Sequence, residues 1–251
     1  MPIKEIHFFS RAERYSRGRG WYESIFAGCR PGAVHGEFST SYLADPDACV
    51  RIAEWYPHAQ VIISLRDPVE RAVSNYRNDV MAGAVSRSAS FREAAACHPE
   101  YLEQSRYTAQ VQRVFETFGR GRTFVAVHEE SVSDPGRCFQ ELYDFLGVDP
   151  EYTPAFLGTG VNRAHTPRSI AMERAIRAGA SLARRTLPSR FAWSLKRRGL
   201  SNWMYALNSR PSGPPRVSSE DREWLLEQLA PDAAELPAVL GRTPRGWSTC
   251  S

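Results

Sequence analysis

The stretch that decides the fold is VIISLRDPVERAVSNY, residues 61–76. Its first five residues are mostly apolar, as is typical of a parallel strand that is buried on both faces. The run ends at Arg66, after which Asp67 can cap a helix and Pro68 suits the first helical position. Because ligands of open α/β sheets bind beyond the carboxyl ends of the strands, Arg66 falls at a candidate site.

The second half of the stretch has helical spacing. Val69, Val73, Tyr76 and Val80 recur at helical intervals, which predicts an amphipathic helix over 68–82 with this stripe facing the sheet. Ser74 lies beside the stripe, about two turns into the helix. A cationic side chain at a strand end, next to the start of a helix, is suited to binding an anionic group.

The whole chain predicts one α/β domain over 1–251, with a three-layer, mainly parallel sheet flanked by helices. Strands that alternate with helices favour parallel pairing. We expect strands at 4–9, 33–38, 61–65 and 123–128. We expect helices at 18–27, 46–55, 68–82, 105–118, 135–146, 169–185 and 219–229.

Composition is that of an ordinary globular protein, with 251 residues, 42% hydrophobic and 24% charged. No apolar run is long enough to span a membrane, and the polar start of the sequence does not resemble a signal peptide. The five cysteines are odd in number and include no CxxC pair. This pattern argues against a zinc site or a disulfide framework and favours a reducing, cytoplasmic setting.

The net charge of +4 is unevenly distributed. Residues 163–222 contain 12 Arg and 1 Lys against 3 acidic residues. Within this segment, 169–216 is predicted to be a basic, aromatic helical insertion in the domain. It could cover the core with a solvated basic face, or 169–209 could contact the acceptor or a membrane surface. Nucleic-acid binding is the least favoured interpretation because no known binding module is present, so we expect no nucleic-acid partner.

The run 61–76 resembles the 3′-phosphate-binding motif of sulfotransferases that use 3′-phosphoadenosine 5′-phosphosulfate (PAPS), above all the heparan-sulfate type and its bacterial relatives. Other blocks resemble the same family in the same order. They are KEIHFF (4–9), GWYESIF (20–26), GEFSTSYL (36–43), the unit 105–148, VNRAHTPRS (161–169) and 229–247. The family often has a lysine where this chain has Phe38, so one expected cationic contact is absent.

The resemblance implies a P-loop NTPase-like sulfotransferase fold, PAPS as the sulfuryl donor, 3′-phosphoadenosine 5′-phosphate (PAP) as the product, and no metal. It assigns the 3′-phosphate to Arg66 and Ser74. Arg163 and Arg168 fall in the basic loop that closes over the nucleotide.

The resemblance also places the catalytic base at Glu5. On the expected strand 4–9, Glu5 and His7 would point to the same face, opposite Ile6 and Phe8. A partly desolvated carboxylate beside an imidazole can accept a proton, with His7 orienting it.

One family feature is missing from this sequence. The family opens with a strand, a phosphosulfate-binding loop and a helix, but no GxxxxGK[ST] loop or equivalent occurs before residue 17. The glycine-arginine fragments at 17–20 and 119–122 lack a preceding buried strand and a following helix. Because loss of that strand would expose unpaired strand edges, we expect the sequence to be incomplete at its N-terminus or its start to be mis-assigned.

Two functions follow from these observations. The first is a PAPS-dependent sulfotransferase that acts on a hydroxyl or amine of a carbohydrate, lipid or natural product. The alternative is a non-catalytic PAP-binding or interaction protein of the same ancestry. A P-loop kinase is disfavoured because the sequence has no Walker loop. The acceptor and the oligomeric state cannot be read from the sequence.

Overall fold

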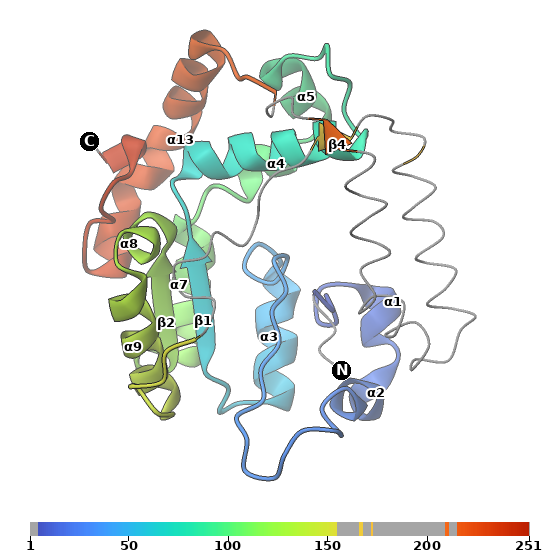
Figure 1. Ribbon diagram of the computed structural model, residues 1–251, viewed down its shortest axis with the longest axis vertical. Helices are drawn as coiled ribbons and strands as arrows, with labels where there is room; N and C mark the ends of the chain where they lie inside the picture. The colour runs from blue at the N-terminus through green and yellow to red at the C-terminus, as the bar shows by residue number, and fades with distance from the viewer. Residues whose placement is uncertain (1–4, 155–165, 168–171, 173–208, 211–214, 251) are drawn as a thin grey trace. The chain divides into compact units, whose positions relative to one another are not determined.

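The computed structural model describes residues 5–154, 166–167, 172, 209–210 and 215–250 (Figure 1). The chain falls into two compact units. The first comprises Met1–Arg71, Leu102–Gly158 and Trp224–Ser251, and the second comprises Ala72–Tyr101 and Thr159–Glu223. Helix α4 (Pro68–Ala82) begins in the first unit and continues into the second.

The first unit contains the two strands that the sequence predicts best. Strands β1 (Val61–Leu65) and β2 (Thr123–Val127) pair in parallel, in register from one end to the other (Figure 1). Strand β2 ends one residue earlier than predicted because helix α8 (His128–Ser133) begins at His128. The carboxyl ends of both strands therefore lie at the same edge of the sheet, as the candidate site requires.

Helices pack on both faces of this sheet, but β1 itself is buried on one face alone: Ile62 is 47% exposed, so the prediction of a strand buried on both faces is wrong. On one face, Ile63 and Leu65 are buried with side chains of α7 (Thr108–Phe118), and Ile52 of α3 (Pro46–Trp55) packs against the same cluster. On the other face, the ring centroids of Phe124 and Phe145, on α9 (Pro135–Leu146), lie 5.6 Å apart. Each large apolar side chain buried here contributes about 1.5–3 kcal/mol. The predicted three-layer α/β architecture is thus confirmed for this unit.

Where the predicted helix limits are correct, the helix begins at a local capping signal. Helices α3, α4 and α9 have the predicted limits, and each begins with a proline after an aspartate. Helix α2 (Gly18–Ser24) and α7 are shorter than predicted because their ends lack strong capping residues. The short elements α1 (Ala12–Tyr15), α5 (Phe91–Cys97), α6 (Glu100–Glu103), α8, η1 (Arg120–Arg122) and η2 (Ser248–Cys250) were not predicted, since so few residues carry little periodicity.

Helix α13 (Ser219–Leu240) runs well beyond the predicted end at 229. Pro231 and Pro237 lie inside it, and an interior proline costs a helix about 3 kcal/mol or more. Its apolar stripe includes Leu225, Leu229 and Leu236, all at most 1% exposed. Burial of this stripe offsets the cost of the two prolines. The sequence signals for helix ends do not include such burial, so the predicted helix ended too early.

Two predicted strands are wrong. Residues 5–7 are irregular with positive φ at Glu5 (56°) and His7 (49°), and residues 8–10 form a turn. A strand alternates between faces, whereas Phe8 and Phe9 are both buried in one aromatic cluster, so the backbone must turn between them. Residues 33–38 form an exposed loop that pairs with no described strand, and Val34 is 57% exposed.

The second unit holds most of α4. The apolar stripe predicted for this helix is buried, since Val73, Tyr76 and Val80 are at most 3% exposed. Helix α5 begins with a reciprocal capping box between Ser90 and Glu93. Two short strands, β3 (Thr166–Pro167) and β4 (Ser209–Arg210), pair in antiparallel fashion. The helix expected at 169–185 and nearly all of the insertion 169–216 lie outside the described residues, and the single-domain interpretation stays a prediction.

Two further findings concern membrane spans and cysteines. None of the helices in the described part of the chain has the length and apolarity that a membrane span requires. Cys29, Cys49, Cys97 and Cys138, whose side chains are described, are free thiols.

Candidate active site

The turn after β1 carries Arg66 at the carboxyl edge of the sheet, where the sequence predicted it. Leu65, the last residue of β1, is fully buried and pairs with Val127 of β2. The next residue, Arg66, leaves the sheet, and α4 begins two residues later at Pro68. Arg66 is thereby fixed between a buried strand and the first turn of a long helix.

Asp67 occupies the capping position that the sequence assigned to it. Its Oδ1 accepts the N–H groups of Val69 (2.9 Å) and Glu70 (3.0 Å), and its carbonyl oxygen accepts the N–H of Arg71. The free N–H groups of the first turn of α4 are therefore already used within the protein. This corrects the expectation that the helix start helps to bind an anion: Arg66 has to supply that interaction through its side chain.

The Arg66 guanidinium has unused hydrogen-bonding capacity. Its Nη2 lies 3.8 Å from Glu70 Oε2, and the side chain is 37% exposed. Its Nε is buried and has no hydrogen-bond partner. A buried donor without a partner costs about 1–3 kcal/mol, so the site favours an acceptor such as a phosphate oxygen. The residues present thus fit an anionic group.

Arg71 is a second arginine on the first turn of α4 with an unused donor. Its Nη2 donates to Gln104 Oε1 (3.1 Å), while Nη1 is buried without a partner. Burial lowers the pKa of Arg71, and burial raises the pKa of the neighbouring Tyr107 to about 12. The sequence analysis did not single out Arg71. Its place five residues after Arg66, at the start of the predicted helix, was the signal that could have indicated it.

The remaining predicted nucleotide contacts stay predictions. Ser74 lies two turns along α4, is half-buried, and belongs to the second unit. Arg163 and Arg168 lie outside the described residues.

Glu5 and His7 come together even though the predicted strand is absent. Glu5 Oε2 lies 3.9 Å from His7 Nε2, and the Glu5 side chain is 39% exposed. Both residues have positive φ, and their neighbours Ile6 and Phe8 are buried. The geometry keeps a solvent-accessible carboxylate beside an imidazole.

The block 36–43 supplies the polar partners of His7. Ser41 Oγ lies 2.7 Å from His7 Nδ1 and 2.6 Å from Ser10 Oγ. The backbone N–H of His7 donates to Ser39 Oγ (2.8 Å). The sequence analysis recognised this block only as a family resemblance. Alternating serines in a block that resembles the family were the signal that could have pointed to these contacts.

The protonation of His7 follows from this environment. Burial lowers the pKa of His7, and the nearby Arg11 lowers it further, which favours the neutral imidazole. If Nδ1 accepts the Ser41 hydroxyl, the ring proton lies on Nε2 and faces the Glu5 carboxylate. A neutral His7 can therefore orient Glu5 without neutralising it, which suits a general base.

A second carboxylate lies in the same polar cluster. Burial raises the pKa of Glu37, whose carboxylate accepts hydrogen bonds from the Tyr42 and Ser39 hydroxyls. Burial also raises the pKa of Tyr42, whose hydroxyl accepts the N–H of Phe9 (3.3 Å). Glu37 and Tyr42 thus tie the loop 36–43 to the segment that carries His7.

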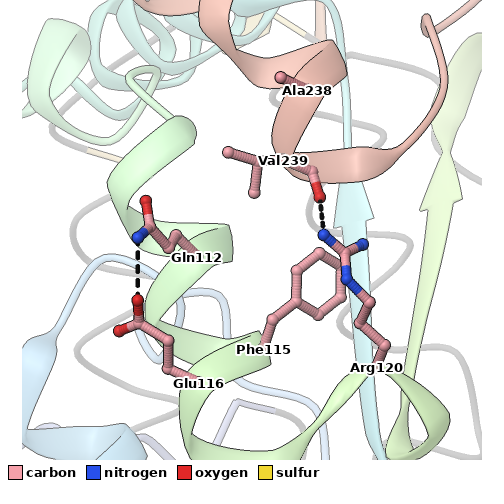
Figure 2. Close-up of a pocket in the computed structure, with 6 residues that line it drawn as sticks. All are labelled: Gln112, Phe115, Glu116, Arg120, Ala238 and Val239. Carbon is pink, nitrogen blue, oxygen red and sulfur yellow. Dashed lines mark hydrogen bonds between the residues drawn. The ribbon is translucent and has the colours of Figure 1, made fainter.

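A hollow of about 440 Å³ lies elsewhere in the first unit and is no part of this site. Figure 2 shows Arg120 against the ring of Phe115 and bonded to the carbonyl oxygen of Val239, with Gln112 bonded to Glu116. The hollow is lined by Gln112, Phe115, Glu116, Arg120, Ala238 and Val239. None of these is a candidate residue, and its polar groups already pair with one another.

Known proteins with similar sequences carry the family assignment. The sulfotransferase family matches residues 22–154, more than half of the chain, and the chain therefore belongs to that family. The match includes the turn with Arg66 and the block 36–43, whereas Glu5 and His7 precede the matched residues.

Individual relatives support the same family assignment. The chain is 28% identical over 154 residues to heparan sulfate glucosamine 3-O-sulfotransferase 3B1 of Mus musculus, covering 57% of this chain and 38% of that protein. It is 27% identical over 166 residues to the bifunctional heparan sulfate N-deacetylase/N-sulfotransferase 3 of Homo sapiens, covering 60% of this chain and 19% of that protein. The chain thus spans well under half the length of these relatives.

A solved structure supports the fold. The crystal structure of a sulfotransferase from Alicyclobacillus acidocaldarius is similar with a TM-score of 0.65 and 26% identity, covering 96% of this chain and 84% of that chain. The predicted α/β sulfotransferase fold is therefore confirmed.

Proposed function

We propose that this protein is a PAPS-dependent sulfotransferase that transfers a sulfuryl group to a hydroxyl or amine of an acceptor and releases PAP. The main support for the proposal is that Arg66 lies at the carboxyl end of β1 and has a buried Nε donor without a partner. In the family that this chain belongs to, the matching arginine holds the 3′-phosphate, with a serine of the next helix, here Ser74.

The acceptor class is supported by the names of the relatives. One is a heparan sulfate glucosamine 3-O-sulfotransferase and another a heparan sulfate N-sulfotransferase, which sulfate an oxygen and a nitrogen. We therefore favour a carbohydrate acceptor over a lipid or another natural product. Contact of 169–209 with a membrane surface and a cytoplasmic location stay predictions.

Glu5 and His7 account for the proton transfer that such a reaction needs. The sulfur–oxygen bond to the 5′-phosphate breaks while a bond from sulfur to the acceptor atom forms. The acceptor proton then passes to the Glu5 carboxylate, which neutral His7 orients. Arg163 and Arg168 are assigned to the nucleotide by resemblance alone.

The nucleotide site is tested by calorimetry with PAP, using ATP as comparator. Replacing Arg66 with alanine removes charge-assisted contacts worth about 2–5 kcal/mol, so PAP binding should weaken by roughly 30-fold or more. Arg137→Ala is the matched control, because Arg137 is a 72% exposed arginine of α9 paired with Glu141. Equal PAP affinity in the Arg66 and Arg137 variants would reject the assignment.

Catalysis is tested separately by sulfuryl transfer from PAPS to a glucosamine-containing glycan. Glu5→Gln should lower the transfer rate about 10²- to 10⁴-fold, the usual contribution of a general base, and leave PAP affinity unchanged.

A non-catalytic PAP-binding protein is the second candidate. It is favoured by Phe38, which is 57% exposed where the family often has a lysine, so one expected cationic contact is absent. PAP binding without transfer to any acceptor tried would support this second function.

A further inference from the structure

The segment 246–248 contacts the turn that carries Arg66, although it is far away in the sequence. The backbone N–H and the hydroxyl of Ser248 both donate to Asp67 Oδ2, at 2.5 and 2.7 Å. These two residues are 181 positions apart. Asp67 therefore bonds the first turn of α4 with one oxygen and the segment 246–248 with the other.

Glu129 joins the same parts of the chain through a second carboxylate. Its Oε1 accepts the backbone N–H of Asp67 (3.1 Å), and its Oε2 accepts the indole N–H of Trp247 (2.9 Å). Gly246 has a positive φ of 79°, and a Cβ added there would lie 3.5 Å from Glu129 Cβ. We call Glu129, Trp247 and Ser248 the latch.

The latch continues into the packing around Arg66. Trp247 is 1% exposed, and its ring centroid lies 6.0 Å from that of Tyr107. The backbone of Arg66 lies close enough to the Tyr107 hydroxyl to lower the pKa of that phenol. These contacts show that Glu129 and Trp247 link the C-terminal segment to the turn that carries Arg66.

The residues on both sides of Arg66 are thus held by distant parts of the chain. Leu65 pairs with β2, Asp67 is hydrogen-bonded to the latch, and the Arg66 backbone lies beside Tyr107. None of these contacts uses the Arg66 guanidinium, whose buried Nε stays unpaired. A side chain whose backbone is fixed in advance loses less freedom when it binds a ligand.

We propose that the latch positions Arg66 for the 3′-phosphate, so that the segment 246–248 sets how strongly the site prefers PAP over nucleotides without that phosphate. This inference rests on the proposed function. Glu129, Trp247 and Ser248 act through the turn as positioning residues and touch no nucleotide themselves.

The test compares PAP with adenosine 5′-monophosphate (AMP) by calorimetry. The two nucleotides differ in the 3′-phosphate, so the ratio of their dissociation constants reports that contact alone. Ser248→Ala removes one hydrogen bond, and Trp247→Phe keeps an aromatic ring, though a smaller one, and removes the indole N–H. We expect each to reduce the preference for PAP by about three- to tenfold with little change in AMP affinity.

The control is Thr117→Val. Thr117 is a part-buried residue of α7 whose hydroxyl donates to the Arg113 carbonyl oxygen at 2.8 Å. This variant also loses one hydroxyl bond in the first unit, but it should keep the full preference for PAP. Melting temperatures of all variants, measured in parallel, identify any that fail to fold. Ser248→Ala should destabilise the protein least, because Ser248 is exposed.

The outcomes separate the two proposals. If Arg66→Ala abolishes the preference while folded Ser248→Ala and Trp247→Phe keep it, the latch is merely structural and the inference is wrong. If the unaltered protein does not prefer PAP, or if Arg66→Ala keeps the preference, the proposed nucleotide site itself fails and the latch has nothing to position. A graded loss in both latch variants, absent in Thr117→Val, supports the inference.

Discussion

Asp67→Ala is expected to destabilise the first unit by about 2–4 kcal/mol. The carboxylate is 2% exposed and accepts four hydrogen bonds, two from the first turn of α4 and two from Ser248. Loss of the helix cap accounts for about 1–2 kcal/mol. Loss of both Ser248 bonds adds about 1–2 kcal/mol, limited because Ser248 is exposed and water can replace part of the contact.

The matched control is Asp134→Ala. Asp134 caps α9 by accepting the N–H of Arg137 (3.1 Å), at an exposed position with no side-chain bond to a distant described segment. Its removal should cost about 1 kcal/mol, so most of the larger cost of Asp67→Ala reports the contact with Ser248. Asp67→Asn should lose most of the same stability, because its amide NH₂ must face N–H donors on one of its two sides.

Urea unfolding followed by tryptophan fluorescence and by circular dichroism measures these differences. A loss of 2–4 kcal/mol corresponds to a fall in melting temperature of roughly 5–15 °C for a chain of this size. Equal free energies of unfolding for the Asp67 and Asp134 variants, within about 0.5 kcal/mol, would show that the Ser248 contact contributes nothing. The description of the turn as held from two sides would then be wrong.

Three further predictions concern other parts of the first unit. The pKa of His7, measured by NMR titration, should lie below the model-peptide value of about 6.5, because burial and Arg11 both disfavour the imidazolium. Because the unfolded chain binds the His7 proton more readily than the folded chain, the free energy of unfolding is highest above about pH 6.5 and falls as the pH is lowered. A His7 pKa equal to the model-peptide value would contradict this prediction. Ile63→Ala should cost about 2–5 kcal/mol in urea unfolding and Ile62→Ala less than about 1 kcal/mol, since their exposed fractions are 4% and 47%; equal costs would reject the assigned faces of β1. Trp247→Ala should cost about 3–5 kcal/mol by the same assay, because it empties a site that is 1% exposed, and a loss below about 1 kcal/mol would show that the ring is not part of the core.

Elements with strong local signals were predictable from the sequence. Strand β1 is an apolar run that stops at a charged residue, and α3, α4 and α9 each start at an Asp-Pro pair. Capping and the extent of an apolar run depend on residues that are neighbours in the chain, so a single sequence is enough to recognise them; the exposed face of β1 was not predicted, because it depends on what packs against the sheet. The same local signals placed Arg66 at the carboxyl end of β1.

Elements that depend on distant contacts were not predictable in the same way. The segment 4–9 has the alternation of a strand, but it packs Phe8 and Phe9 into one cluster with α1, α2 and α3 and bonds His7 to the block 36–43. Helix α13 passes two prolines because its apolar stripe is buried. In both cases tertiary packing contributes more free energy than the local preference.

The sequence by itself determined the family resemblance, the parallel strands, the long capped helices, and Glu5, His7 and Arg66 as candidates. Only the tertiary structure decided what surrounds those candidates. It showed that Asp67 uses the N–H groups at the start of α4, that serines of the block 36–43 bond His7, and that Ser248 and Glu129 hold the turn before Pro68. The physical reason is range: a cap or an apolar run is specified by adjacent residues, whereas these hydrogen bonds join segments that come together only when the core is packed.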